Sequence, residues 1–62
     1  MELSDTIALM NSKDYKDRFC AEYWQTKIRF GKLKVMEEYL HLLEIRAVME
    51  GVDLYAPLAG VS

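Results

Sequence analysis

Four side chains in the first half of the sequence have the types and the spacing needed to hold a phosphorylated ligand. With 100° between successive helical residues, Arg18, Arg29 and Lys32 fall within a wedge of roughly 80°, and Tyr15 lies at its edge. Guanidinium and ammonium groups form charge-assisted hydrogen bonds with phosphate, and a tyrosine ring can stack on a base. The alternative is an ordinary polar helix face, in which Arg18 pairs with Glu22 four residues later.

Positive charge is concentrated in the same part of the chain. Residues 13–34 contain seven basic and three acidic groups, whereas residues 35–62 contain one basic and five acidic groups. Within 27–34 there are four basic residues and no acid, a pattern that suits a small anion. The acidic second half would repel a long duplex, so no long nucleic acid is expected as a partner. The candidate ligand-binding residues are Tyr15, Arg18, Tyr23, Lys27, Arg29 and Lys32. Tyr23 also belongs to the apolar pattern described below, which favours it as a core residue.

Groups that could perform catalysis or hold a metal are sparse. Cys20 is the only cysteine, and the only histidine, His41, lies 21 residues later with no third group to orient it. Glu37 and Glu38 are adjacent, so on a helix they diverge by 100° and cannot share one substrate. No Gly-rich phosphate loop and no known metal or nucleophile motif occurs. We therefore expect that the protein is not an enzyme and that it has neither a metal site nor a cofactor.

Helical periodicity predicts the elements that would position these side chains. Leu3, Ile7 and Met10 predict a short amphipathic helix over about 3–10, which would dock on the rest of the chain. From Lys13 onward, one apolar stripe with steps of three and four residues includes Phe19, Tyr23, Phe30, Leu33, Leu40, Leu43 and Ala47. A second stripe runs beside it through Cys20, Trp24, Ile28, Val35, Tyr39, Leu42 and Met49. A single helix with two apolar stripes needs partner chains, so the pattern predicts an obligate oligomer.

Gly31 separates two possible architectures. Because a glycine inside a helix costs only about 1 kcal/mol and the first stripe keeps its phase across it, we favour one long, possibly kinked helix over about 13–50. Ser12 would cap this helix, and Gly51 would end it as a left-handed residue. The alternative is a tight helical hairpin broken near Gly31. In either case residues 51–62 form an apolar tail that is expected to dock on a neighbouring subunit.

The chain as a whole is expected to be one small all-α domain over 1–62, made of a docking segment (1–12), an oligomerising helix (13–50) and a tail (51–62). A lone domain of this size buries only about 60% of its unfolded surface, so assembly into a dimer or tetramer is the expected source of extra stability. No uncharged apolar run approaches about 18 residues, and the first residues lack a signal-peptide pattern. A cytoplasmic location without membrane association is expected.

Two segments of the sequence resemble a known family. The run Tyr15-x-x-Arg18-x-x-x-Glu22-Tyr23, followed by Arg29-x-x-Lys32-Leu33, resembles the first helix of the phage sponge proteins that oppose CBASS and Thoeris defence. Met36-x-x-Tyr39-x-x-x-Leu43-x-x-Arg46 is similar to the family's second helix, so the resemblance spans roughly 15–54. The departure is the missing hairpin tip, because here Leu33 runs almost directly into Met36.

This resemblance implies a function that the spacing alone does not. It implies a helical oligomer in the host cytoplasm that serves immune evasion by sequestering a cyclic oligonucleotide or a cyclic ADP-ribose isomer without cleaving it. The alternative hypothesis is a coiled helical oligomer that acts as a protein–protein interaction module, with the apolar tail as the contact.

Overall fold

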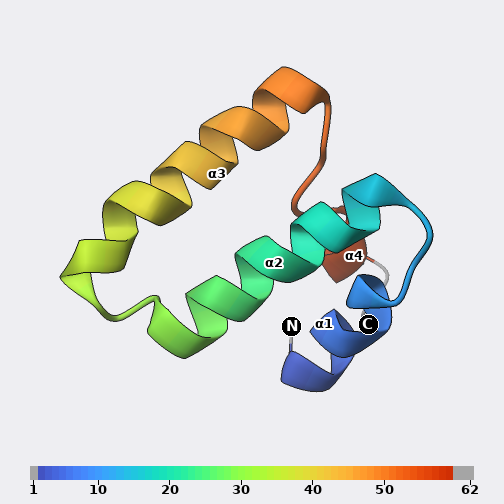
Figure 1. Cartoon of the computed structure of the whole chain (residues 1–62), viewed down its shortest axis with the longest axis horizontal. Coiled ribbons are helices and arrows are strands. Elements are labelled where there is room, and N and C mark those ends of the chain that lie inside the picture. The colour runs from blue at the N-terminus through green and yellow to red at the C-terminus, as the bar shows by residue number, and fades with distance from the viewer. Residues whose placement is uncertain (1, 60–62) are drawn as a thin grey trace.

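The structure, a computed structural model, describes residues 2–59, and its secondary structure over them is helical, with no strand (Figure 1). In chain order it contains α1 (Leu3–Met10), α2 (Tyr15–Phe30), the short 3-10 turn η1 (Lys34–Met36), α3 (Glu37–Glu50) and the short helix α4 (Ala56–Ala59). Helices α2 and α3 run in opposite directions as a hairpin, and α1 and α4 lie near its open end (Figure 1). The all-α prediction and the short helix over 3–10 are confirmed.

The expected continuous helix over about 13–50 is wrong, because the chain reverses after Phe30. The N–H of Gly31 still donates to the carbonyl of Lys27, at 2.9 Å, and so closes the last turn of α2. The next bond, from the N–H of Leu33 to the carbonyl of Phe30 at 3.0 Å, forms a tight turn. Leu33 itself is extended, with φ −81° and ψ 124°, and the chain then enters η1. The hairpin alternative, broken near Gly31, describes the structure.

This reversal folds the first apolar stripe onto itself. Phe19 and Tyr23 of α2 share one buried cluster with Leu40, Leu43 and Ala47 of α3. Each of these side chains is less than a tenth exposed. A rod would need a second chain to cover the same stripe, whereas the hairpin covers it within one chain. Hydrophobic burial therefore has an intramolecular solution that the periodicity alone did not distinguish from assembly.

The first residues of the tail dock on the hairpin of the same chain, and residues 60–62 of the predicted tail lie outside the described residues. Val52 and Leu54 are both 6% exposed and belong to the core cluster. The indole N–H of Trp24 donates to the carbonyl of Leu54 at 2.7 Å, and the thiol of Cys20 lies 3.5 Å from the carbonyl of Asp53. These contacts fix the chain after α3 against α2.

The helix ends are formed by residues that the sequence signals only in part. Asp14, and not Ser12, caps α2 by accepting from the N–H of Lys16 at 3.0 Å. The hydroxyl of Ser12 instead donates to Asp17 at 2.7 Å. The prediction for Gly51 is confirmed: it ends α3 in the left-handed region, with φ 71°, where a residue with a Cβ would be strained.

Helix α1 covers the side of α2 that faces away from α3 (Figure 1). Thr6 on α1 and Ala21 on α2 are both completely buried, and their small side chains suit a close approach of the two helices. The hydroxyl of Thr6 donates to the carbonyl of Leu3 at 2.6 Å, so this buried polar group is satisfied. Within the described residues, no helix combines the length and the apolar character needed to cross a membrane.

Candidate functional site

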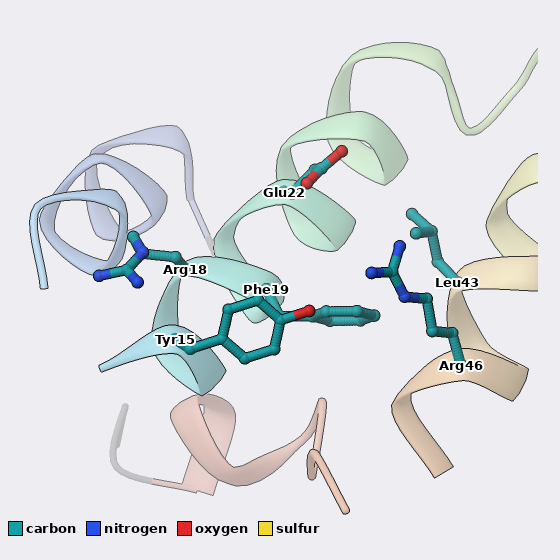
Figure 2. A pocket seen from close by; sticks show the side chains of 6 residues that line it. All are labelled: Tyr15, Arg18, Phe19, Glu22, Leu43 and Arg46. Carbon is teal, nitrogen blue, oxygen red and sulfur yellow. The ribbon is translucent and has the colours of Figure 1, made fainter. Parts of the chain in front are cut away.

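A cleft of about 290 Å³ lies between α2 and α3 near the open end of the hairpin. Six side chains line it: Tyr15, Arg18, Phe19 and Glu22 from α2, and Leu43 and Arg46 from α3 (Figure 2). Phe19 and Leu43 are buried and give the cleft an apolar base. Arg18 and Arg46 lie on opposite sides of the rings of Tyr15 and Phe19 (Figure 2). The cleft thus combines cationic, aromatic and carboxylate groups from two helices.

Arg46 is the cation that the structure holds most firmly. Its Nε donates to a carboxylate oxygen of Glu50 at 2.7 Å, and its guanidinium carbon lies 5.8 Å from the centre of the Phe19 ring. The hydrogen bond with Glu50 raises the pKa of Arg46, and the same bond lowers the pKa of Glu50. The terminal nitrogens of Arg46 point toward the cleft (Figure 2). They are positioned to donate to an anion.

Tyr15 supplies an exposed aromatic ring at the edge of the cleft. Its hydroxyl donates to Glu50 at 3.0 Å, and its ring meets Phe19 edge-on, with centroids 6.2 Å apart and an interplanar angle of 67°. The hydrogen bond to Glu50 raises the pKa of the phenol, so Tyr15 is neutral at physiological pH. Glu50 therefore orients both Arg46 and Tyr15. A ring held in this way can stack on a planar ligand group.

Arg18 and Glu22 complete the rim without forming the helical pair that the sequence allowed. Arg18 donates from Nη1 to the carbonyl of Ser12 at 2.9 Å, which turns its guanidinium toward the loop before α2 (Figure 2). Glu22 accepts from the hydroxyl of Tyr39 at 3.1 Å, and this bond raises the pKa of Tyr39. In residues 2–59 the only ion pair within 4.0 Å is that of Arg46 and Glu50. The remaining donors of Arg18 and the second oxygen of Glu22 are available for other contacts.

The structure divides the six predicted ligand-binding residues among three places. Tyr15 and Arg18 line the cleft, whereas Arg29 and Lys32 are exposed beside the turn and do not line it. Tyr23 is 1% exposed in the core, and its hydroxyl donates to Glu44 at 3.1 Å.

Burial and the bond to Glu44 raise the pKa of Tyr23 to about 12. The ammonium of Lys27 lies 5.6 and 5.3 Å from the ring centres of Tyr23 and Trp24, a cation–π contact on the outside of the core. Tyr23 and Lys27 thus have structural contacts in the hairpin. Arg29 lies on α2 like Arg18, but 11 residues further along the helix, about 16 Å from it along the axis.

Arg46 is the main cleft residue that spacing did not select. In a continuous helix it would lie 28 residues beyond Arg18, about 42 Å along the axis. Only the reversal of the chain brings the two together. The signal that could have identified Arg46 is its place in the second segment of the family resemblance, since it is the only basic residue after residue 34.

Cys20 is buried and contributes no exposed thiolate. Burial raises its pKa, with further contributions from Asp17 and Asp53, so the thiol is protonated at neutral pH. It behaves as a small core side chain. Among the residues that the structure describes, no group of three or more His, Cys, Asp or Glu side chains could hold a metal ion.

The chain was compared with protein-family models, with curated proteins and with solved structures, and no match was found in any of the three. The function of the cleft must therefore be inferred from its own geometry.

Proposed function

We propose that this protein binds a cyclic nucleotide immune signal in the cleft between α2 and α3 and sequesters it, uncleaved, in the host cytoplasm. The observation that carries the proposal is that Tyr15, Arg18 and Arg46, from two helices, line one small cleft. Both segments that resemble the sponge family contribute to it, Tyr15, Arg18 and Glu22 from the first and Leu43 and Arg46 from the second. The folded chain places them together although 31 residues separate the ends of this set.

Each group has a defined part in this proposal. The terminal nitrogens of Arg46 donate to phosphate oxygens, and Arg18 adds a second cation at the opposite rim. Tyr15 stacks on a base, and the carboxylate of Glu22 accepts from a base N–H. The volume of the cleft, about 290 Å³, is small for a ligand-binding pocket. It accommodates one nucleotide unit, and the remainder of a cyclic dinucleotide or cyclic ADP-ribose isomer extends along the surface.

Calorimetric titration tests this proposal with a panel of cyclic dinucleotides, cyclic trinucleotides and cyclic ADP-ribose isomers. Each charge-assisted hydrogen bond to phosphate contributes about 1.5–3 kcal/mol, so Arg46→Gln weakens binding roughly tenfold or more. Tyr15→Ala causes a similar loss through stacking. Arg29→Ala is the matched control, because Arg29 is an exposed cation on α2 outside the cleft. The ligand is recovered unchanged after heat denaturation.

Two results would contradict the proposal. One is the absence of heat with every ligand of the panel. The other is an equal loss of affinity in Arg29→Ala and Arg46→Gln, which would mean that binding follows total charge and not the cleft. Circular dichroism of each variant confirms that the helices are retained.

A second candidate function, a protein-interaction module, is favoured by a different observation. Fourteen large hydrophobic side chains are exposed among the described residues. They include Val35, Leu42, Val48 and Met49 on η1 and α3, and Phe30 and Leu33 at the turn. Stabilisation by cyclic nucleotides in a thermal-shift assay supports the first candidate, and its absence favours the second.

A further inference from the structure

The closed end of the hairpin, residues 27–35, carries apolar and cationic side chains next to one another. Its apolar side chains are Ile28, Phe30, Leu33 and Val35, which are 41, 45, 52 and 80% exposed. Its cations, all of them exposed, are Lys27, Arg29, Lys32 and Lys34. Along the chain each of these cations is directly followed by one of the apolar residues. The closed end is therefore both apolar and positively charged.

The cations of the closed end have no carboxylate partners. Within residues 2–59 the one ion pair joins Arg46 to Glu50, at the other end of α3. The acids nearest in sequence on the α3 side, Glu37 and Glu38, lie in the first turn of that helix and form no ion pair with these cations. Four cations and these two carboxylates leave a net charge of +2 over residues 27–38. The positive charge is available to an external anion.

The backbone of the closed end is internally hydrogen-bonded. The N–H groups of Gly31 and Leu33 donate to the carbonyls of Lys27 and Phe30 at 2.9 and 3.0 Å. The N–H of Met36 donates to the carbonyl of Leu33 at 3.0 Å. Because these N–H groups do not need water as a partner, the turn can approach an apolar medium at a lower cost. In Figure 1 it forms the end of the hairpin that is remote from α4.

A lipid surface offers what this combination of side chains requires. The boundary of an anionic bilayer places phosphate groups beside acyl chains, so cations and apolar side chains of one short segment are satisfied together. A nucleic acid would satisfy the cations and leave Leu33 and Val35 in water. An apolar protein groove would cover the apolar side chains and leave the cations without counter-charges.

We propose that the closed end of the hairpin docks on an anionic lipid bilayer, with Phe30, Leu33 and Val35 at the acyl boundary and the cations among the headgroup phosphates. The expectation of no membrane association rested on the lack of a long apolar run, which is required to span a bilayer and not to lie on its surface. About 22 Å along α2 separates Phe30 from Tyr15, so the cleft remains open to solvent in the docked molecule. The inference goes beyond the proposed function and does not depend on the cleft.

Co-sedimentation with vesicles tests this docking. The full chain is expected to bind vesicles made of equal parts of phosphatidylglycerol and phosphatidylcholine and to remain unbound with phosphatidylcholine alone. Lys32→Glu is expected to weaken binding about tenfold or more, because it replaces an attraction to the surface by a repulsion. Lys13→Glu makes the same change in total charge before the other end of α2 and is expected to bind nearly as wild type does. No binding to the mixed vesicles, equal binding to both kinds of vesicle, or equal losses in the two variants overturns the proposal.

A polarity-sensitive dye distinguishes insertion from adsorption by charge alone. Val35→Cys and Val48→Cys are matched positions for the dye, because Val35 and Val48 are 80 and 81% exposed and only Val35 is at the closed end. The native Cys20 is 3% exposed and is not labelled. Adding the mixed vesicles is expected to shift the emission of the dye at position 35 to shorter wavelength and to leave that at position 48 unchanged. An unchanged emission at position 35 overturns the proposal and favours a protein partner, and tighter binding to polyuridylic acid than to the vesicles overturns it in favour of RNA.

Discussion

The two apolar faces of α3 have similar side chains and opposite environments. Leu43 is 8% exposed on the inner face, which also holds the buried residues Leu40 and Ala47. Its neighbour Leu42 is 57% exposed on the outer face, which also holds Ile45 and Met49. The inner face is covered by Phe19 and Tyr23 of the same chain, because the turn after Phe30 brings α2 against it. The outer face has no such cover within the described residues. Periodicity thus identifies the apolar faces of a helix, whereas chain topology determines which of these faces another helix of the same chain covers.

The candidate ligand cleft lies at the boundary between these two faces. On the helical wheel Arg46 is located between Leu42 and Leu43, with its guanidinium against Phe19 and its Nε bonded to Glu50. A long side chain with a polar head suits this position, since its stem covers apolar surface and its charge remains in water. The cleft therefore lies where the packing of α2 against α3 ends and the side chain of Arg46 reaches from the core to solvent.

The largest expected effect comes from truncating the two neighbouring leucines. Leu43→Ala removes buried methyl groups and leaves a cavity, so it lowers the free energy of unfolding by about 2–5 kcal/mol at every protein concentration. Leu42→Ala has a much smaller effect, because Leu42 is 57% exposed and lies outside the core cluster. Urea denaturation of both variants over a range of protein concentrations provides the measurement. If Leu43→Ala and Leu42→Ala lower the free energy of unfolding equally at low protein concentration, the two faces are equally buried.

A second, smaller effect concerns the inner face at high pH. The pKa of Tyr23 is about 12 in the folded chain and 10.0 without the fold. Its contribution to stability is therefore complete below pH 10 and is lost as the pH rises through about 12, by at most about 2–3 kcal/mol. Hydrogen bonds to carboxylates raise the pKa of Tyr15 and Tyr39, which act in the same direction.

Tyr23→Phe is the control for this pH effect. It retains the ring in the core but removes the group that titrates, so its denaturation midpoint should fall less steeply across this pH range than that of wild type. If the two proteins show parallel pH profiles, the loss comes from other groups. The comparison is made with urea midpoints at several pH values.

The smallest expected effect is at the turn that creates the two environments. A Cβ at Gly31 would overlap the carbonyl oxygen of Lys27, so Gly31→Ala destabilises the hairpin by about 1 kcal/mol. A continuous helix would give the opposite sign, because alanine stabilises a helical position by about 0.4–1 kcal/mol. The denaturant midpoints of wild type and Gly31→Ala decide between the two. Lys32→Ala, at an exposed neighbour, is the control and changes stability by less than about 0.5 kcal/mol.

Much of the local structure was predictable from the residues. Leu3, Ile7 and Met10 predicted α1, and Gly51 was correctly assigned as the left-handed residue that ends α3. Residues of both apolar stripes lie on α2 and α3, although the periodicity placed them on one continuous helix. At the cleft, Tyr15 and Arg18 were selected by residue type and spacing, since an aromatic ring beside a guanidinium is a local pattern on one helix.

The sequence by itself determined the helical class, the apolar faces and the location of the positive charge, because these depend on neighbours within a few turns of one helix. Only the tertiary structure decided that the helix reverses after Phe30, since a glycine in helical dihedrals can continue a helix or cap it. That reversal brings Arg46 of α3 to the cleft that Tyr15 lines on α2. It also docks Leu54 on Trp24 of the same chain. Contacts between residues distant in sequence depend on which apolar faces pack against each other in the folded chain. Local periodicity does not contain that information.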